Sequence, residues 1–264
     1  MTIIDFHTHI FPDSLAERAL NALKSHSPEA KSYTDGTLAG LRRSMKQAGI
    51  SRAALLPIAT KPSQVSTINK TCKDLVAPDT IPFGTIHPGA DTFTDDIAVL
   101  VSSGIKGIKF HPEYQDFYIS EPRYFPIYDA LQSAGMIVVF HAGKDPGPFT
   151  CDHALPPAFK EIHKNFPRLK IVAAHLGGWR VWVDVEKYML DLPIYFDSSA
   201  IREWMAPEEF IRLARKHGTD KILFGSDSPW FDQAADVRWI NLMNLTSEEK
   251  EKIFHKNAEI LLGE

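Results

Sequence analysis

Two histidines separated by a single residue stand near the start of the chain, in the segment Asp5-Phe6-His7-Thr8-His9. This segment continues a short apolar run, and side chains alternate between the two faces of a strand. His7 and His9 therefore point the same way, as two imidazoles that suit zinc, iron, nickel or copper. A His-x-His pair also arises by chance, so the pair by itself supplies only half of a candidate metal site.

Two more histidines close later apolar segments. His141 ends Val138-Val139-Phe140-His141, and His175 ends Val172-Ala173-Ala174-His175. A lone histidine at the end of a strand is often a hydrogen-bonded core residue, but alongside a His-x-His pair both become candidate ligands or catalytic groups. The small residues that follow each histidine leave room for a ligand to approach the backbone.

Asp227 is a carboxylate at the end of another apolar segment, Leu223-Phe224-Gly225-Ser226-Asp227. Aspartate is a favoured helix N-cap, so a purely structural role remains open. A carboxylate at the end of a buried strand otherwise needs a compensating charge, which a divalent cation supplies. Asp227 is therefore a candidate ligand and proton acceptor.

Lys109 and His111 share one face of the segment Gly107-Ile108-Lys109-Phe110-His111. If that face points inward, Lys109 binds a substrate anion or, once carboxylated, bridges two metal ions, because a desolvated amine is more readily neutral. An ion pair with a nearby carboxylate is the structural alternative. Loop position alone adds the weaker candidates His87, Glu113, Arg202 and Trp230, and we expect solvent exposure for His26, His163, His217 and His255.

Eight short apolar segments alternate along the chain with amphipathic ones. Their near-continuous hydrophobicity is typical of parallel strands that are covered on both faces. The expected strands are residues 3–9, 53–58, 82–87, 107–111, 137–141, 171–175, 194–197 and 222–227. The expected helices are residues 37–48, 121–134, 207–217 and 247–262, with a capping box at Thr246 and Glu249 and helix-ending glycines at Gly49, Gly104, Gly135 and Gly218.

This alternation predicts an α/β fold, a (β/α)₈ TIM barrel that spans residues 1–264 as a single domain. An open doubly wound sheet is the alternative. Active-site residues of barrels lie at the carboxyl ends of the strands. The polar candidates fall at those ends, which makes a shared site the simplest interpretation.

The composition is that of an ordinary globular protein, with 44% hydrophobic residues, 23% charged residues and a net charge of −4. No basic run predicts a nucleic-acid partner, and no apolar stretch approaches the roughly 18 residues that span a membrane. Cys72 and Cys151 are too few for a disulfide framework, and the start of the chain does not read as a signal peptide. We therefore expect a cytoplasmic protein with a small-molecule substrate. Barrels of this size often self-associate, which leaves a homodimer open, without a named interface.

Together these segments resemble the amidohydrolase superfamily, in particular the amidohydrolase-related group of aminocarboxymuconate-semialdehyde-decarboxylase-like enzymes. The segments that carry the resemblance are Asp5-Phe6-His7-Thr8-His9, Gly107-Ile108-Lys109-Phe110-His111-Pro112, Phe140-His141-Ala142-Gly143, Ala174-His175-Leu176-Gly177-Gly178, Phe224-Gly225-Ser226-Asp227-Ser228-Pro229 and Lys256-Asn257-Ala258-Glu259-Ile260-Leu261-Leu262. They occur in this order over nearly the whole chain.

The resemblance implies a barrel that holds a divalent metal, usually zinc. His7, His9, His141 and Asp227 would bind the metal. His175 would orient or deprotonate a water, or bind a second ion. Lys109 fits the bridging carboxylated lysine of some relatives, but the decarboxylase-like branch does not require one. We favour one ion and keep two open.

The expected function is that of a metal-dependent hydrolase that acts on a small-molecule amide, ester or lactone. The cation would lower the pKa of water from about 15.7 towards 7, Asp227 would take up the proton, and His175 would stabilise the oxyanion. The alternative is a non-oxidative decarboxylase of an aromatic or muconate-type acid, in which Lys109 or Arg202 holds the carboxylate. A non-catalytic metal-binding barrel fits less well, because the ligand set has no cysteine and includes an extra histidine.

Overall fold

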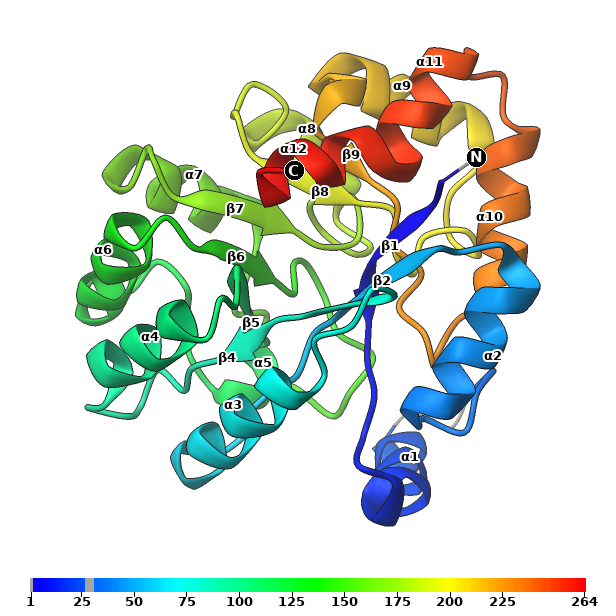
Figure 1. Cartoon of the computed structure of the whole chain (residues 1–264). Coiled ribbons are helices and arrows are strands. Elements are labelled where there is room, and N and C mark those ends of the chain that lie inside the picture. Colours follow the sequence, from blue (N-terminus) through cyan, green and yellow to red (C-terminus); the bar gives the residue numbers. More distant parts are fainter. Residues whose placement is uncertain (1, 27–30) are drawn as a thin grey trace.

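Short parallel strands alternate with helices along the chain (Figure 1). The computed structural model describes residues 2–26 and 31–264. The strands are β1 (Ile4–Thr8), β2 (Arg52–Leu55), β3 (Thr80–Pro82), β4 (Gly84–Thr85), β5 (Gly107–Phe110), β6 (Ile137–Phe140), β7 (Lys170–Ala173), β8 (Tyr195–Asp197) and β9 (Ile222–Leu223).

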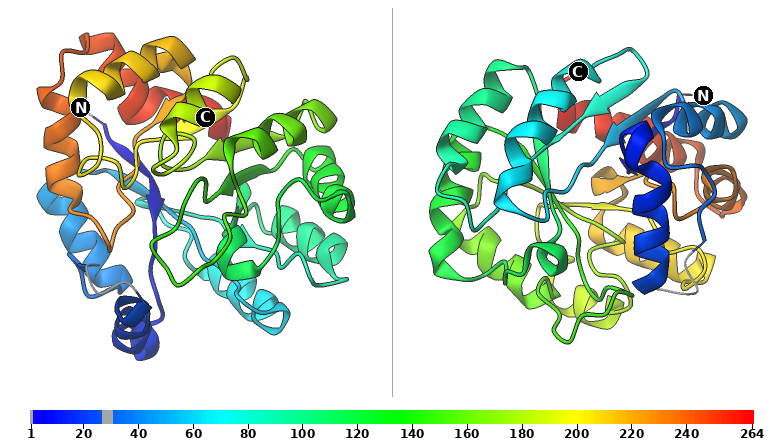
Figure 2. Two further views of the ribbon diagram at one scale, coloured as in Figure 1. Left: turned by 180° about the vertical axis from the view of Figure 1, so that it is seen from behind. Right: turned by 90° about the horizontal axis from the view of Figure 1, so that it is seen from below.

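The helices cover the outside of the strands, as both views in Figure 2 show. They are α1 (Asp13–His26), α2 (Leu38–Ala48), η1 (Pro62–Gln64), α3 (Val65–Asp74), α4 (Phe93–Ser102), α5 (Pro112–Gln115), η2 (Pro122–Tyr124), α6 (Phe125–Ser133), α7 (Pro156–Asn165), α8 (Trp182–Tyr188), α9 (Pro207–His217), η3 (Thr219–Lys221), α10 (Gln233–Leu242), α11 (Ser247–Glu251), the π-helical η4 (Lys252–Lys256) and α12 (Asn257–Leu262).

The described strands form a three-stranded sheet, β1-β2-β3, and a six-stranded sheet, β4 to β9, with every pairing parallel. Only Phe83 separates β3 from β4, and its N–H still donates to Leu55 of β2. On the opposite side, the N–H of Phe6 in β1 donates to the carbonyl of Phe224 at 2.7 Å, just after β9. The last strand therefore lies beside the first, which gives the expected (β/α)₈ TIM barrel and excludes an open doubly wound sheet.

The predicted strands are confirmed within one or two residues at most ends, with two informative differences. The predicted strand 82–87 covers the end of β3 and all of β4, two short strands that are separate because β3 pairs with β2 and β4 pairs with β5. The predicted strand 222–227 is reduced to Ile222 and Leu223. The N–H of Phe224 donates to Ile253 in η4, and Asp227 has a φ of 68°, which a strand cannot contain.

Local signals placed the helix ends more accurately than the helix interiors. Thr37 caps α2 by accepting from the N–H of Gly40, and the capping box of Thr246 and Glu249 opens α11 as predicted. The predicted helix 247–262 is continuous but passes through the π-helical segment η4. Helices α1, α3, α5, α7, α8 and α10 were not predicted, although Asp232 caps α10 and prolines open α7. Of α4, the sequence predicted only the end, at Gly104.

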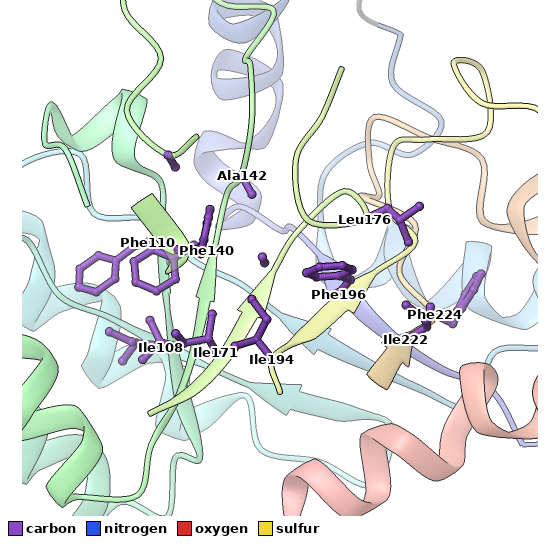
Figure 3. Close-up of a cluster of buried hydrophobic side chains, with 14 of the residues drawn as sticks. Ile108, Phe110, Phe140, Ala142, Ile171, Leu176, Ile194, Phe196, Ile222 and Phe224 are labelled. Carbon is purple, nitrogen blue, oxygen red and sulfur yellow. The ribbon is translucent and has the colours of Figure 1, made fainter. Parts of the chain in front are cut away.

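The strand residues divide between two faces, and this division fixes which residues can reach a site. Ile108, Phe110 and Phe140 pack with Ile171, Phe196 and buried helix residues in one hydrophobic cluster (Figure 3). Because successive side chains alternate, Lys109 lies on the opposite face. Its Nζ is 3.2 Å from Nε2 of His7, so that face points into the barrel.

The loops that follow β6 and β7 are joined by main-chain hydrogen bonds. The N–H of Trp179 donates to Ala142 at 2.8 Å, and the N–H of Lys144 donates to Trp179 at 3.0 Å. Gly143 lies between these bonds with a φ of 90°, and a Cβ there would lie 2.3 Å from N of Trp179. The pairing therefore requires glycine at this position.

Replacing Gly143 with alanine is expected to lower the free energy of unfolding by about 3 kcal/mol or more, because left-handed strain adds to a main-chain clash. Gly104→Ala is the matched control. Gly104 has a φ of 74°, but a Cβ there would meet nothing within 4 Å, so it is expected to cost about 1 kcal/mol. Urea denaturation measures both. Equal losses would show that the contact with Trp179 relaxes without cost.

One expectation about exposure is wrong. His217 is 3% exposed, and its two ring nitrogens lie 3.1 Å and 2.9 Å from the carbonyls of Leu190 and Ile194. Its ring also stacks on Phe196 with centroids 3.9 Å apart. His163 and His255 are partly buried, and the side chain of His26 lies outside the described residues. In the described part of the chain, no helix combines the length and apolar character needed to cross a membrane.

Candidate metal centre

Three of the predicted ligands converge at one edge of the barrel. His7 lies in β1, His9 directly follows β1, and Asp227 follows β9, with one ligand atom of each within 4.8 Å of the others. Nε2 of His9 lies 3.2 Å from Oδ1 of Asp227, and Nε2 of His7 lies 3.7 Å from the same oxygen. The N–H of Asp227 donates to the carbonyl of His7 at 2.8 Å, which holds the two segments together.

His141 and His175 form a pair beside this group. Nδ1 of His141 lies 3.0 Å from Nε2 of His175. The ring of His175 stacks on that of His7, with centroids 5.2 Å apart and planes at 29°. All five predicted ligands therefore lie in one region, as a group of three and an adjoining pair.

The outer nitrogen of His9 determines the state of its inner one. Nδ1 of His9 lies 2.7 Å from the carbonyl of Leu56. A carbonyl oxygen only accepts, so Nδ1 donates, and Nε2 of the neutral ring carries a lone pair. That lone pair faces Oδ1 of Asp227, which also only accepts when ionised. Two acceptors at 3.2 Å repel unless a proton or a metal cation lies between them.

The pair of His141 and His175 shows the same arrangement. Nε2 of His141 lies 3.0 Å from the carbonyl of Lys144. Nδ1 of His175 lies 3.2 Å from the carbonyl of Ser199 and 2.8 Å from its hydroxyl, which donates its own proton to Asp197. Each outer nitrogen is thus the donor of its neutral ring, and the two inner nitrogens face one another with lone pairs. The residues fit a cation here for the same reason as at His9.

Asp197, at the end of β8, orients His7 rather than offering a ligand. Its Oδ2 lies 2.8 Å from Nδ1 of His7. Its Oδ1 accepts from the N–H groups of His175 and Ser199 and from the hydroxyl of Ser199. The carboxylate is fully buried and both oxygens are occupied, so it fixes the tautomer that leaves Nε2 of His7 free.

Lys109 is buried in the same group. Its side chain is 1% exposed, and among the residues that the structure describes no carboxylate lies within 4 Å of its Nζ. Burial lowers the pKa of Lys109 to about 8, although Asp197 and Asp227 partly oppose the shift. The ion-paired alternative is therefore not seen, and Lys109 contributes a buried amine next to His7 that loses its proton more easily than an exposed lysine does.

The buried imidazoles are neutral at physiological pH. Burial lowers the pKa of His7, His141 and His175 well below the usual 6.5, and neighbouring cationic groups lower it further. Burial by itself raises the pKa of Asp227, but its contact with His9 and its proximity to His7 and Lys109 outweigh burial and leave the pKa below its usual value. Neutral imidazole and ionised carboxylate are the forms that bind metal.

A second polar group lies behind His141, and the sequence indicated only its members His111 and Glu113. Nε2 of His111 lies 3.4 Å from Oδ2 of Asp145, and Tyr114 packs edge-on against His111. Asp145 lies in the loop after β6 and Tyr114 in the four-residue helix α5, and neither segment has a periodic signal. The rings of His111 and His141 are stacked at 4.3 Å and 11°, so their in-plane lone pairs cannot both point at one ion. The first group is therefore the better metal site.

The weaker candidates divide among different surroundings. Nδ1 of His87 accepts from the N–H of Gly89 in its own loop. Arg202 donates to Asp236 at 2.6 Å. Trp230 is half-buried after Asp227. Glu113 is buried, and its Oε2 has no hydrogen-bond partner among the described residues but lies 3.6 Å from Nδ1 of His111.

Glu113 predicts an unusual pH dependence of stability. Burial raises the pKa of Glu113 to about 7, from 4.5 in an exposed setting. The folded state therefore holds a proton that the unfolded state releases near pH 4.5, so this contribution to stability falls as pH rises from about 4.5 to 7. Glu113→Gln is expected to gain about 2 kcal/mol relative to the parent protein between pH 5 and pH 8.

Urea denaturation of metal-free protein at several pH values measures this effect. The exposed Glu161→Gln is the control and should follow the parent protein at every pH. A constant difference between Glu113→Gln and the parent protein would contradict the raised pKa.

A (β/α)₈ barrel with histidines and an aspartate gathered at the carboxyl ends of its strands has the architecture of a barrel enzyme. Residues 4–263 match the amidohydrolase family. The chain belongs to this family, which confirms the resemblance noted in the sequence.

The similar proteins come from several organisms. A probable dihydroorotase of Schizosaccharomyces pombe is 28% identical over 99 residues, which cover 34% of this chain and 29% of that protein. A Tim-barrel protein of Bordetella bronchiseptica is 19% identical with a TM-score of 0.79, covering 100% of this chain and 99% of the other. A manganese-containing 5-carboxyvanillate decarboxylase of Novosphingobium aromaticivorans is 18% identical with a TM-score of 0.79, covering 100% and 96%.

Proposed function

We propose that the protein is a metal-dependent hydrolase that uses water to cleave a small-molecule amide, ester or lactone. The observation that carries the proposal is the pair of facing acceptors, His9 with Asp227 and His141 with His175. Each pair needs a cation between its atoms, and a divalent ion is the cation whose chemistry suits imidazole and carboxylate together. The similarity to a dihydroorotase supports hydrolysis.

The ligands proposed for one ion, most simply Zn²⁺, are Nε2 of His7, Nε2 of His9, Nδ1 of His141 and a carboxylate oxygen of Asp227. His175 adjoins them and would complete a second position if two ions bind. Backbone carbonyls or Asp197 hold the other nitrogen of each ring, which presets the ligand tautomers.

A divalent cation bound there would supply an acidified water near neutral pH. Asp227, as an ionised carboxylate, takes the proton and returns it to the leaving group. Lys109 places a positive charge beside His7 and would stabilise an oxyanion in its protonated form. His175 was expected to stabilise the oxyanion, but its Nδ1 faces a carbonyl, so the neutral ring presents an acceptor. We therefore assign it a ligand or proton-accepting role.

The second candidate is a non-oxidative decarboxylase, and the similarity to 5-carboxyvanillate decarboxylase favours it. In that reaction Lys109 would hold the substrate carboxylate. Arg202 is less suited, because its guanidinium already pairs with Asp236. The substrate class would then be an aromatic or muconate-type acid.

Elemental analysis of protein purified without chelators, followed by a screen of lactones, amides and carboxylated aromatics, tests the proposal. We expect one equivalent of divalent metal and product labelled by ¹⁸O from water. Release of CO₂ without incorporated ¹⁸O would identify the lyase instead. Protein that holds no divalent metal under any loading condition would contradict both.

A further inference from the structure

Two cations stand just beyond the metal centre, on the loops that carry His141 and His175. Lys144 follows His141 by three residues, and Arg180 follows His175 by five. The hydrogen bonds that join Trp179 to Ala142 and Lys144 hold the two loops side by side. The same backbone pairing therefore positions both the inner histidines and the two outer cations.

Arg180 is fixed on aromatic faces. Its guanidinium carbon lies 4.4 Å from the ring centroid of Trp204 and 5.4 Å from that of Trp179. The two indoles pack edge to face at 5.7 Å. Arg180 also has a φ of 60°, a strained conformation that such surroundings must maintain. Stacking on the indoles satisfies the flat face of a guanidinium and leaves its N–H edges for another partner.

A cavity of about 400 Å³ opens at this pair of cations, a volume suited to a small molecule. Its walls are Lys144, Asp145, Pro146, Trp179 and Arg180. Oδ2 of Asp145 lies 3.8 Å from Nε2 of His141, so the cavity adjoins the outer side of a proposed metal ligand. A neighbouring cavity of about 580 Å³ shares Lys144 and Arg180.

Neither cation is neutralised within the described ranges, because no carboxylate lies within 4 Å of Lys144 or Arg180. Asp145 faces His111 and His141 instead. In the neighbouring cavity Glu186 and Glu209 pair with Arg212, and Asp184 forms no ion pair with either cation. Two exposed positive charges on one cavity attract an anion, and a guanidinium edge matches an oxyanion in shape.

We propose that Lys144 and Arg180 bind an oxyanion, such as a carboxylate, of a small organic acid whose reacting group lies at the metal centre. The substrate class is thereby narrowed to acids that carry an anionic group in addition to the bond that reacts. The position of the reacting group at the metal centre rests on the proposed function. The binding of an oxyanion by Lys144 and Arg180 rests on the cavity alone.

Benzoate and its neutral isostere benzamide test the anion site without any turnover. Binding is followed by calorimetry and by the fluorescence of Trp179 and Trp204, in metal-free protein and again with Zn²⁺. We expect benzoate to bind at least about tenfold more tightly than benzamide in metal-free protein. Arg180→Met and Lys144→Met should each weaken benzoate binding about tenfold and leave benzamide unchanged.

Arg123→Met is the matched control, because Arg123 also lies over an aromatic ring, that of Tyr124, at 4.7 Å. It should bind benzoate like the parent protein. Thermal unfolding checks that each variant is folded, and two independent variants keep the test decisive. Equal affinity for benzoate and benzamide, or unchanged benzoate binding in both variants, would overturn the proposal.

The two proposals fail in different ways. Protein that binds no metal but still prefers benzoate through Arg180 would refute the metal-dependent function and keep the anion site. Protein that binds metal and turns over substrate, yet shows no preference for benzoate over benzamide, would refute the anion site alone.

Discussion

Asp227→Asn is expected to lower kcat/KM by about 10³-fold while the protein stays folded. A carboxamide cannot take up the proton that Asp227 removes from water, and loss of general acid–base catalysis costs roughly 10² to 10⁴ in rate. The change also removes the negative charge that faces His9 at 3.2 Å. Steady-state kinetics at saturating metal, with the substrate identified by the screen, measures the effect.

Asp232→Asn is the matched control for this substitution. Asp232 lies five residues further along and caps α10 by accepting from the N–H groups of Ala234 and Ala235. Asparagine caps a helix equally well, so activity and stability should both be retained. Near-full activity in Asp227→Asn would remove this residue from the mechanism, whatever its position.

The strand ends were predictable from the sequence because their signals are local. A buried parallel strand is visible in the sequence as a run of apolar residues. Because side chains alternate between the faces of a strand, His7 and His9 are placed on one face without any knowledge of the fold. The order of strands in a barrel then brings β1 beside the segment that holds Asp227. The repeated alternation of strands and helices was sufficient to predict that His7, His9 and Asp227 lie close together.

The roles of individual nitrogens could not be predicted in the same way. Whether Nε2 or Nδ1 of a histidine faces the site depends on which carbonyl its other nitrogen meets. Leu56 supplies that carbonyl for His9 and Ser199 for His175, and both are far from their histidine in sequence. The burial of His217 has the same origin, since its partners belong to the loop before β8. Periodicity describes faces, and it contains no information on such pairwise distances.

Asp197 illustrates the consequence for the site. In the sequence it is only the last residue of the predicted strand 194–197, yet its contacts join β1 to the segments that follow β7 and β8. Oδ1 accepts from three donors, and Oδ2 accepts from Nδ1 of His7. One buried carboxylate therefore links three segments of the site and also sets the tautomer of a proposed ligand.

Asp197→Asn is expected to weaken metal binding by about 10- to 100-fold, with a similar loss of turnover at limiting metal. Because three groups donate to Oδ1, the carbonyl oxygen of the asparagine takes the position of Oδ1, and its NH₂ takes the position of Oδ2. That NH₂ donates to Nδ1 of His7, which moves the ring proton to Nε2 and removes the lone pair that faces Asp227 and Lys109. Competition against a chromophoric chelator measures the affinity.

The exposed Asp79→Asn, which only weakens a surface ion pair with Arg42, is the control and should bind metal like the parent protein. A lower melting temperature in Asp197→Asn with unchanged metal affinity would mean that Asp197 merely supports the fold. Weaker metal binding in a variant that unfolds at the parent temperature would instead separate orientation from stability. The melting temperature reports the support that Asp197 gives to the fold, and the metal affinity reports its effect on the His7 tautomer. Together they decide whether this tautomer controls the metal centre.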